Sequence, residues 1–409
     1  MVNLIPWKRI LASWVEPRRL AEVLAEVLAA IVQAGSARWS EIARHMPGSE
    51  AAAYKRLQRL VARFDPRAVL RRWCLQEAPI VIVDITEVER PHARRTEYVG
   101  VLPPKDAGRK RRRKKAPNTQ ASQEASAQRP SPRRRGFWLV LLGLPFRGRV
   151  LPCGWWTYSS KTLEEEASSQ NLEVQRFLED LRALLQGRPL VANRGFHNRR
   201  FFAWLQAHGI PFIVRVRMKP PLTLADAQGE SLRPVLLPGQ TQIWPSVRHH
   251  ELEGLTLIGH WEEGRSEPLW LLTTWPDPQE ALRWYRWRMR IEAGFRDLKS
   301  HLGIEANMNQ RRDWMDRTMG LVLLAYGIAL LAGELLRDLR WGRQGLPSSW
   351  ATWRPPQHPH RKWLAYSGLF VLRKLKFPLP GSSRRRWRHL LIQWPTFLAQ
   401  PAVQTPVQS

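Results

Sequence analysis

The chain has 409 residues and an apolar fraction of 44%, which is enough for a hydrophobic core and excludes a wholly disordered protein. Its 65 Lys and Arg residues against 35 Asp and Glu give a net charge of +30 and a pI near 11.4, an excess that favours a polyanionic partner such as nucleic acid. Two distant cysteines, Cys74 and Cys153, argue against a disulfide framework and against a Cys/His zinc cluster. The N-terminus lacks a signal-peptide pattern, so we expect a cytoplasmic protein.

Residues 1–75 have the pattern of three short helices. Apolar residues spaced by three and four run from Leu20 to Val32 and predict a helix with one buried face, which ends at Gly35. Ser40 is the predicted N-cap of a second helix, and a third, with a basic face, is predicted from Glu50 to Phe64. Three small helices, the last of them basic, favour a helix-turn-helix-like DNA-binding domain. An all-helical cap on the next domain would show the same pattern.

Residues 76–217 predict the first part of an α/β core. The dense Val and Ile run Pro79–Val88 contains Asp84 and is typical of a central strand that is covered on both faces. Residues Thr96–Leu102 are predicted to be its hairpin partner. Residues 103–135 break all periodicity and hold twelve Lys and Arg against two acids, a net charge of +10. We expect a disordered basic insertion there, which either holds the DNA backbone or is a solvated loop.

The rest of the chain alternates between strands and helices and then becomes irregular. Strands are predicted at 136–146, 150–158, 188–192, 210–217 and 269–275, and helices at 162–185, 199–208 and 278–302. Residues 218–267, rich in Pro, Gly and short alternating stretches, predict an inserted β-rich subdomain, and residues 268–340 predict the second part of the core. The apolar run 320–333 is short for a bilayer and predicts a buried core helix. Residues 341–409 form a basic tail rich in Pro and Trp.

The predicted helix 278–302 carries a second acid between cations. At about 100° per residue, four side chains fall within an arc of about 60°: Tyr285, Arg288, Glu292 and Lys299. This face suits a metal-bound phosphate, with Glu292 for the metal and Arg288 and Lys299 for phosphodiester oxygens. An ordinary exposed face with an Arg288–Glu292 ion pair explains the spacing equally well.

The segment YRWRMRIEAGFRDLKSHLG closely resembles the Y-x2-R-x3-E-x6-K signature of IS4-family DDE transposases, particularly the IS10-like group, and fills all four signature positions. VIVDITEVE around Asp84 resembles the first catalytic strand of that family. PLVANRGFHNRRFFAWLQAHGIPFIVRVR resembles the segment that carries the second catalytic acid, and it has Asn193 at that position. The resemblance covers about residues 1–340.

The resemblance implies an α/β fold: a mixed-sheet, RNase H-like catalytic core with an inserted β-rich subdomain and a helical N-terminal DNA-binding domain. Asp84, Asn193 and Glu292 would be the catalytic positions and the ligands of two Mg²⁺ or Mn²⁺ ions. Tyr285, Arg288 and Lys299 would hold the phosphate backbone. Trp261 and Trp270 lie where family members trap a flipped base, although packing is the commoner role of a Trp.

The activity implied is cut-and-paste transposition of an insertion sequence, by phosphodiester hydrolysis and transesterification. Family members cut the element's ends, often through a hairpin, and join the 3′ ends to target DNA. The implied partners are double-stranded DNA, both terminal inverted repeats and target, and a second copy of the chain in a synaptic homodimer. We expect association with the nucleoid and no membrane.

Asn193 departs from the family pattern, because an amide carries no negative charge to offset the repulsion of two close divalent ions. We expect metal binding and cleavage to collapse while the fold and DNA binding survive. Engineered inactivation, natural decay and takeover by a neighbouring acid are the possible explanations. Three functions stay open: a transposase disabled at Asn193, a non-catalytic relic that binds element ends, and a nuclease of the same fold.

Overall fold

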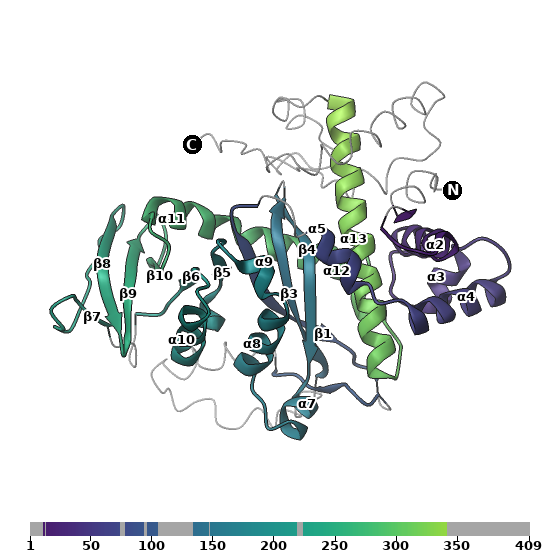
Figure 1. The fold of residues 1–409 in the computed structure, drawn as a ribbon, viewed down its shortest axis with the longest axis horizontal. Helices are drawn as coiled ribbons and strands as arrows, with labels where there is room; N and C mark the ends of the chain where they lie inside the picture. The colour runs from purple at the N-terminus through teal and green to yellow at the C-terminus, as the bar shows by residue number, and fades with distance from the viewer. Residues whose placement is uncertain are drawn as a thin grey trace, which may run out of the picture.

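The computed structural model describes residues 11–12, 14–73, 78–93, 96–104, 134–146, 148–218 and 224–341. Within them, ten strands form one mixed sheet with the order β2-β3-β1-β5-β6-β10-β9-β8-β7, and β4 pairs with β3 (Figure 1). The strands are β1 Val81–Glu89, β2 Gly100–Val101, β3 Arg135–Phe146, β4 Arg149–Tyr158, β5 Leu190–Ala192, β6 Phe212–Arg215, β7 Leu224–Ala225, β8 Thr241–His249, β9 Leu252–His260 and β10 Leu269–Thr273. The helices are α2 Arg18–Ala34, α3 Trp39–Arg44, α4 Glu50–Arg63, α5 Arg67–Trp73, α7 Ser160–Glu165, α8 Gln170–Asp180, α9 Arg182–Leu185, α10 Arg199–Ala207, α11 Pro278–Trp287, α12 Met289–Ser300 and α13 Arg312–Trp341, with short 3₁₀ turns η2 Arg194–Phe196 and η3 Ile304–Ala306.

Strand β1 lies inside the sheet, as its dense Val and Ile run predicts. It pairs antiparallel with β3 over eight residues and parallel with β5 over three. The prediction that Thr96–Leu102 is the hairpin partner of β1 is wrong, because β2 pairs with β3. The longer β3 occupies that edge of β1 from Ile82 to Glu89, which leaves no room there for the shorter segment.

The two faces of the sheet bury separate hydrophobic clusters. Ile82 and Val88 of β1 pack in the cluster that contains α12, α13 and the N-terminal helices. Val81 and Val83 point the other way and pack in the cluster that contains α8 and α10. Because side chains alternate along a strand, Asp84 shares the face of Ile82 and Val88. The only acid in the buried half of β1 therefore points toward α12.

The N-terminal helices pack against α13. The indole of Trp39 on α3 donates a hydrogen bond of 3.0 Å to Thr318 and stacks on Trp314 at 5.3 Å between ring centroids. The helices predicted at Leu20–Val32 and Glu50–Phe64 are confirmed as α2 and α4, and Gly35 ends α2 with a φ of 62°. Ser40 is not an N-cap, because α3 already begins at Trp39. This packing is that of an all-helical cap. Lys55, Arg59 and Arg63 of α4 remain exposed, so DNA binding by this domain stays a prediction.

Two predicted helices are divided in the structure. The segment 162–185 forms α7, α8 and α9, because Ala167 takes a φ of 46° and Ser169 caps a new helix. The segment 278–302 forms α11 and α12, with Arg288 between them. The strands and the helix predicted between 136 and 217 are confirmed as β3, β4, β5, α10 and β6, and the strand at 269–275 as β10.

The apolar run 320–333 lies inside α13, which is 30 residues long. The expectation that this run is too short to span a bilayer therefore does not hold for the whole helix. Within the described residues, Arg312–Gly333 is the one helical stretch long and apolar enough to cross a membrane, and 89% of its most apolar window is buried inside the protein. A helix buried to this extent is part of the hydrophobic core.

The segment 218–267 contains strands, as predicted. They extend the central sheet, since β9 pairs with β10 and β10 pairs with β6. The predicted basic insertion is too long at both ends, because Pro103, Pro104, Arg134 and Arg135 have defined positions. Its other residues, 105–133, lie outside the described residues, as do Cys74 and all of the predicted tail 341–409 except Trp341.

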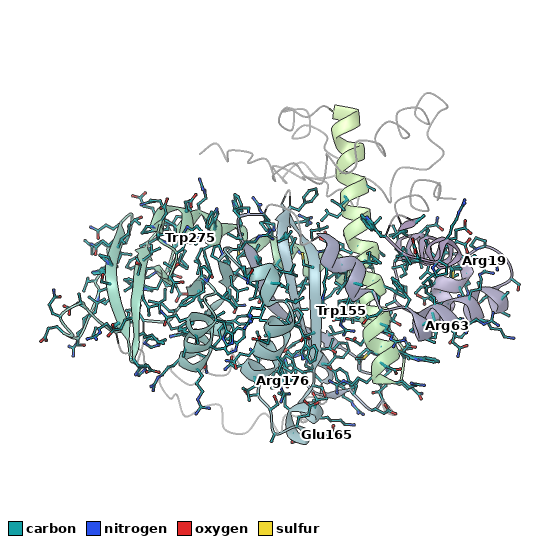
Figure 2. All side chains as sticks on the ribbon, in the orientation of Figure 1. Arg19, Arg63, Trp155, Glu165, Arg176 and Trp275 are labelled. Atoms are coloured by element: carbon teal, nitrogen blue, oxygen red, sulfur yellow. The ribbon has the colours of Figure 1, made fainter. Side chains whose placement is uncertain are left out.

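At Gly320, α13 packs directly against a side chain of the sheet. A Cβ atom at this position would lie closer than 3.0 Å to the ring of Trp155. That ring is held between the sheet and α13 by a hydrogen bond of 2.9 Å to Asp316 and by Arg67 at 4.6 Å (Figure 2). Since the ring has no room to move, the backbone of α13 would have to shift.

We therefore expect Gly320→Ala to lower the free energy of unfolding by about 1–3 kcal/mol in urea denaturation. Gly294→Ala on α12 is the matched control, because the nearest atom to its Cβ is the Tyr326 hydroxyl at 3.4 Å. The control should be neutral or more stable by up to about 1 kcal/mol, from helix propensity. Equal effects of the two changes would contradict the close packing at Gly320.

Candidate active site

Asp84, Asn193 and Glu292 come together at one point of the sheet. Val83 of β1 pairs with Ala192 of β5 in parallel register, so the residues that follow, Asp84 and Asn193, lie side by side. Asn193 is the first residue after β5, at the carboxyl end of a parallel strand, where α/β sheets place functional groups. Glu292 reaches the same point from α12, which covers this face of the sheet.

The amide of Asn193 is a hydrogen-bond donor to Asp84. Its Oδ1 accepts a bond of 2.6 Å from the backbone N–H of Gly195, and its Nδ2 donates one of 2.6 Å to Asp84 Oδ1. The backbone N–H fixes which end of the amide is oxygen, because only the oxygen can accept from it. Ile85 N–H donates to the same Asp84 oxygen at 2.8 Å. Asp84 Oδ1 therefore already accepts two hydrogen bonds.

Arg288 bridges the two carboxylates. Its Nη1 donates to Asp84 Oδ2 at 2.8 Å and its Nη2 to Glu292 Oε1 at 2.7 Å. Arg288 is 6% exposed, and its buried Nε has no hydrogen-bond partner among the described residues. The Arg288–Glu292 pair of the alternative interpretation exists, but the guanidinium is buried over Asp84 and does not lie on an ordinary exposed face.

A local distortion of the helix carries Arg288 into this position. The N–H of Arg288 bonds to the carbonyl of Tyr285 at 3.1 Å, and the N–H of Ile291 bonds to the carbonyl of Arg288 at 3.0 Å. Both bonds span three residues, one fewer than in an α-helix. The single straight helix assumed in the sequence-based prediction is therefore tightened at the residue that binds Asp84.

The other two signature residues diverge. Tyr285 is buried, with its ring 5.7 Å from the Arg288 guanidinium carbon, and burial raises its pKa. Lys299 lies two turns beyond Glu292 and donates to the backbone carbonyl of Glu87 at 2.5 Å. Its Nζ is also 3.5 Å from Glu305. Tyr285, Arg288 and Glu292 thus gather near Asp84, whereas Lys299 is tied to the far half of β1.

Burial controls the electrostatics of Asp84. Removal from water raises the pKa of this carboxyl from 3.8 to about 6, and the adjacent Arg288 offsets part of the rise. The group is thus mostly ionised at neutral pH and holds its charge against Arg288. Glu292, by contrast, has a side chain that is 46% exposed.

Several contacts around the site were not evident from the sequence. Glu87 and Glu89 point away from Asp84, as strand alternation predicts, and both accept bonds of 2.6 Å from Arg134. His249 is 3% exposed and lies beside His197, whose pKa is lowered to about 4 mainly by burial. The partners of Arg134 could have been found only by knowing how β3 pairs with β1.

The two tryptophans considered for base trapping have packing roles here. Trp270 is 8% exposed and packs against Trp244 at 5.8 Å between ring centroids. Trp261 donates its indole N–H to the carbonyl of Arg265 at 2.9 Å.

The residues present do not fit the two ions that the resemblance implies. Within the described residues, no cluster of three or more His, Cys, Asp and Glu side chains could hold a metal ion. The site offers two carboxylates and one amide, and the guanidinium of Arg288 already lies between the carboxylates. Its net charge of −1 is too small to offset two divalent cations at close range.

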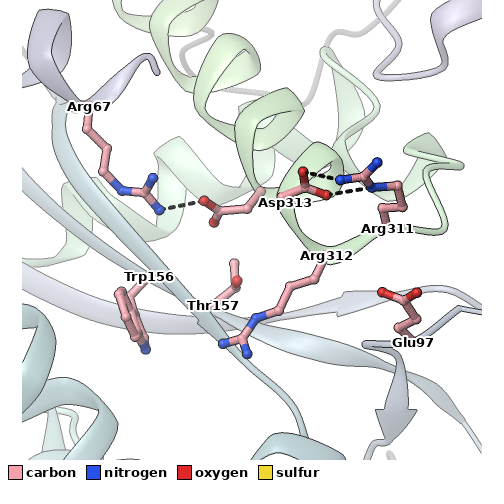
Figure 3. Close-up of a pocket in the computed structure, with 8 residues that line it drawn as sticks. Arg67, Glu97, Trp156, Thr157, Arg311, Arg312 and Asp313 are labelled. Carbon is pink, nitrogen blue, oxygen red and sulfur yellow. Dashed lines mark hydrogen bonds and ion pairs between the residues drawn. The ribbon is translucent and has the colours of Figure 1, made fainter. Parts of the chain in front are cut away.

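A cavity of about 770 Å³ elsewhere in the described structure contains none of these residues (Figure 3). It opens beside β4 and the beginning of α13. Four of its charged side chains form ion pairs, Arg311 with Asp313 at 2.9 Å and Arg67 with Asp316 at 2.5 Å. The cluster around Asp84 is therefore the better candidate site.

Residues 166–328 match the family model described as the transposase DDE domain. This match supports a DDE transposase, and the mixed α/β sheet is consistent with the RNase H-like core of such enzymes. Asn193, Glu292 and the whole four-residue signature lie inside the matched range, while Asp84 precedes it. No curated protein matches the chain. A transposase domain implies a DNA substrate, and the family generally uses divalent metal ions.

The raised pKa of Asp84 has a consequence for stability. The folded protein binds a proton at this carboxyl more readily than the unfolded chain does, since the pKa rises from 3.8 to about 6. The contribution of this carboxyl to the free energy of unfolding is therefore fully present below about pH 4 and is lost as the pH rises through about 6, by at most roughly 3 kcal/mol.

Urea denaturation of the chain and of Asp84→Asn across this range isolates the effect, because the variant has no carboxyl to titrate. We expect the chain's stability relative to the variant to fall as the pH rises. A flat or rising difference would show that Asp84 is not a buried carboxylate.

Proposed function

We propose that this protein is a DNA transposase of the IS4 family, IS10-like group, organised for cut-and-paste transposition but disabled in strand cleavage at Asn193. The observation that carries the proposal is the hydrogen bond of 2.6 Å from the Asn193 amide to Asp84, at the place of the second catalytic acid. The complete four-residue signature and the transposase DDE domain match support the family.

The chemistry of this contact explains the loss of cleavage. A carboxylate at position 193 would bring an oxygen to 2.6 Å from Asp84 Oδ1, a repulsive pair that a divalent cation would relieve. The amide turns the same contact into an attractive one and removes a negative charge. The site of this chain is therefore stable without ions and has lost the charge needed to hold two of them.

The remaining basic residues fit the binding of double-stranded DNA. Arg288 and Lys299 would bind phosphates of the element's end, beside Tyr285, and the exposed Lys55 and Arg59 of α4 would bind the terminal inverted repeat. Two ends in one synaptic complex imply a homodimer, which also binds target DNA. The protein would act in the cytoplasm, on the nucleoid.

A second candidate function is a relic that occupies element ends without cutting them. The relic is favoured because no third acid among the described residues joins Asp84 and Glu292 in a group that could hold a metal ion. In the first candidate, Asn193→Asp alone would restore cleavage. In the relic, it would not.

The test uses a plasmid that carries the DNA flanking this gene, incubated with Mg²⁺ or Mn²⁺. We expect the chain as it stands to leave the DNA intact and Asn193→Asp to cut the element's ends, through a hairpin, and to join the 3′ ends to target DNA. Asn198→Asp is the matched control, because Asn198 caps α10 and an Asp caps equally well. The control should remain inactive.

Equal cutting by the chain and Asn193→Asp would show that Asn193 is not the lost acid. Failure of both to cut, with both bound to the ends, would favour the relic. Cutting without joining would indicate a nuclease.

DNA binding itself should not depend on Asn193, because the amide and a carboxylate have nearly the same shape. In EDTA, we expect the chain and Asn193→Asp to bind a duplex of the element's end within about a factor of three, measured by fluorescence anisotropy. Affinity should fall at least about tenfold between about 50 and 200 mM salt, through counterion release. Binding that ignores salt would contradict recognition of phosphates.

A further inference from the structure

We propose that Arg288 is the built-in cation of this site: it occupies the position between Asp84 and Glu292 until a DNA phosphate draws it away. The inference rests on the proposed function, since it takes these carboxylates as the remains of a DDE site. It assigns Arg288 a positioning role besides that of a phosphate ligand, since Arg288 links Asp84 and Glu292 in the absence of DNA.

Geometry supports the substitution of a guanidinium for an ion. One terminal nitrogen of Arg288 lies 2.8 Å from Asp84 and the other 2.7 Å from Glu292, so a single cation links the two carboxylates. Asp84 Oδ1 is taken by Asn193 and Ile85, which leaves Oδ2 as the oxygen shared with Arg288. An ion that binds between Asp84 and Glu292 therefore competes directly with Arg288.

An unsatisfied donor indicates where Arg288 would go. Its Nε is buried and has no hydrogen-bond partner in the part of the chain that the structure describes, a condition that costs free energy in a closed site. A phosphate oxygen accepts strongly from arginine, often from two nitrogens at once. Movement of the guanidinium onto a phosphate would satisfy Nε and uncover both carboxylates in one step.

The neighbouring arginine does not share this arrangement. Arg290 stacks on Trp287 at 4.5 Å, and no carboxylate partner is found for it within the described residues. It has the same charge on the same helix and lies two residues from Arg288. Arg290→Gln is thus a matched control for Arg288→Gln.

The experiment measures Mn²⁺ binding by electron paramagnetic resonance of the free ion, in the Asn193→Asp background that restores the third acid. Without DNA, we expect Arg288→Gln to tighten Mn²⁺ binding by on the order of tenfold, since it removes a competing charge. Arg290→Gln should leave the affinity unchanged.

The second arm keeps Arg288 in place and adds a short duplex of the element's end. We expect the duplex to tighten Mn²⁺ binding to Asn193→Asp by a similar factor and to have no such effect on the variant that also lacks Arg288. Mn²⁺ bound by the DNA itself is subtracted with Asn193→Asp/Glu292→Gln. If Arg288→Gln does not fold, the comparison of Asn193→Asp with and without the duplex decides the question.

Unchanged or weaker Mn²⁺ binding after Arg288→Gln in a folded variant would overturn the inference, and so would a duplex without effect on Asn193→Asp. Absence of Mn²⁺ binding to Asn193→Asp in every condition would instead overturn the proposed function and, with it, the inference.

Discussion

Two carboxylates on one face of the sheet need a positive charge between them, and the protein supplies it from its own chain. Asp84 is 4% exposed and cannot rely on water to stabilise its charge. Arg288 pairs with it at 2.8 Å and links it to Glu292. A buried charge left without its partner is strongly destabilising, typically by about 3–5 kcal/mol, so this contact constrains everything around it.

The fold sets up that contact through the sheet and one irregular helix. The antiparallel pairing of β1 with β3 and its parallel pairing with β5 bury the strand and leave Asp84 beside the end of β5. The shortened turns at Arg288 direct its guanidinium over Asp84. Behind α12, the long helix α13 and the N-terminal helices complete the hydrophobic cluster on this face. The elements on this face of the sheet therefore position the ionic bridge that runs from Asp84 through Arg288 to Glu292.

Much of this arrangement could be predicted from the sequence, because it follows from local patterns. The Val and Ile run around Asp84 identified the buried strand, and the four-residue signature identified the helix that faces it. The resemblance to IS4-family transposases implies the convergence of Asp84, Asn193 and Glu292. Asn193 was recognised as a missing acid because its neighbours resemble the family's second catalytic segment.

Other features depend on contacts between distant residues and could not be predicted. Arg288 is buried because the helix is tightened between Tyr285 and Ile291. A regular projection at 100° per residue does not represent that tightening. Pairing of β2 with β3, in place of β1, depends on competition between strands for one edge. Lys299 was expected beside the phosphate, but the carbonyl of Glu87 and the carboxylate of Glu305 hold it elsewhere. The match to the transposase DDE domain covers the signature but not Asp84, and the structure places that residue beside Asn193 and Arg288.

The central claim is that a guanidinium and an amide take the place of metal ions in this chain. Crystals of the chain and of Asn193→Asp, each grown with Mn²⁺ and a duplex of the element's end, would test it by anomalous scattering at the manganese edge. The account predicts no manganese peak between Asp84 and Glu292 in the chain as it stands, and a peak there in Asn193→Asp with Arg288 on a phosphate. A manganese peak at that position in the chain itself would contradict it.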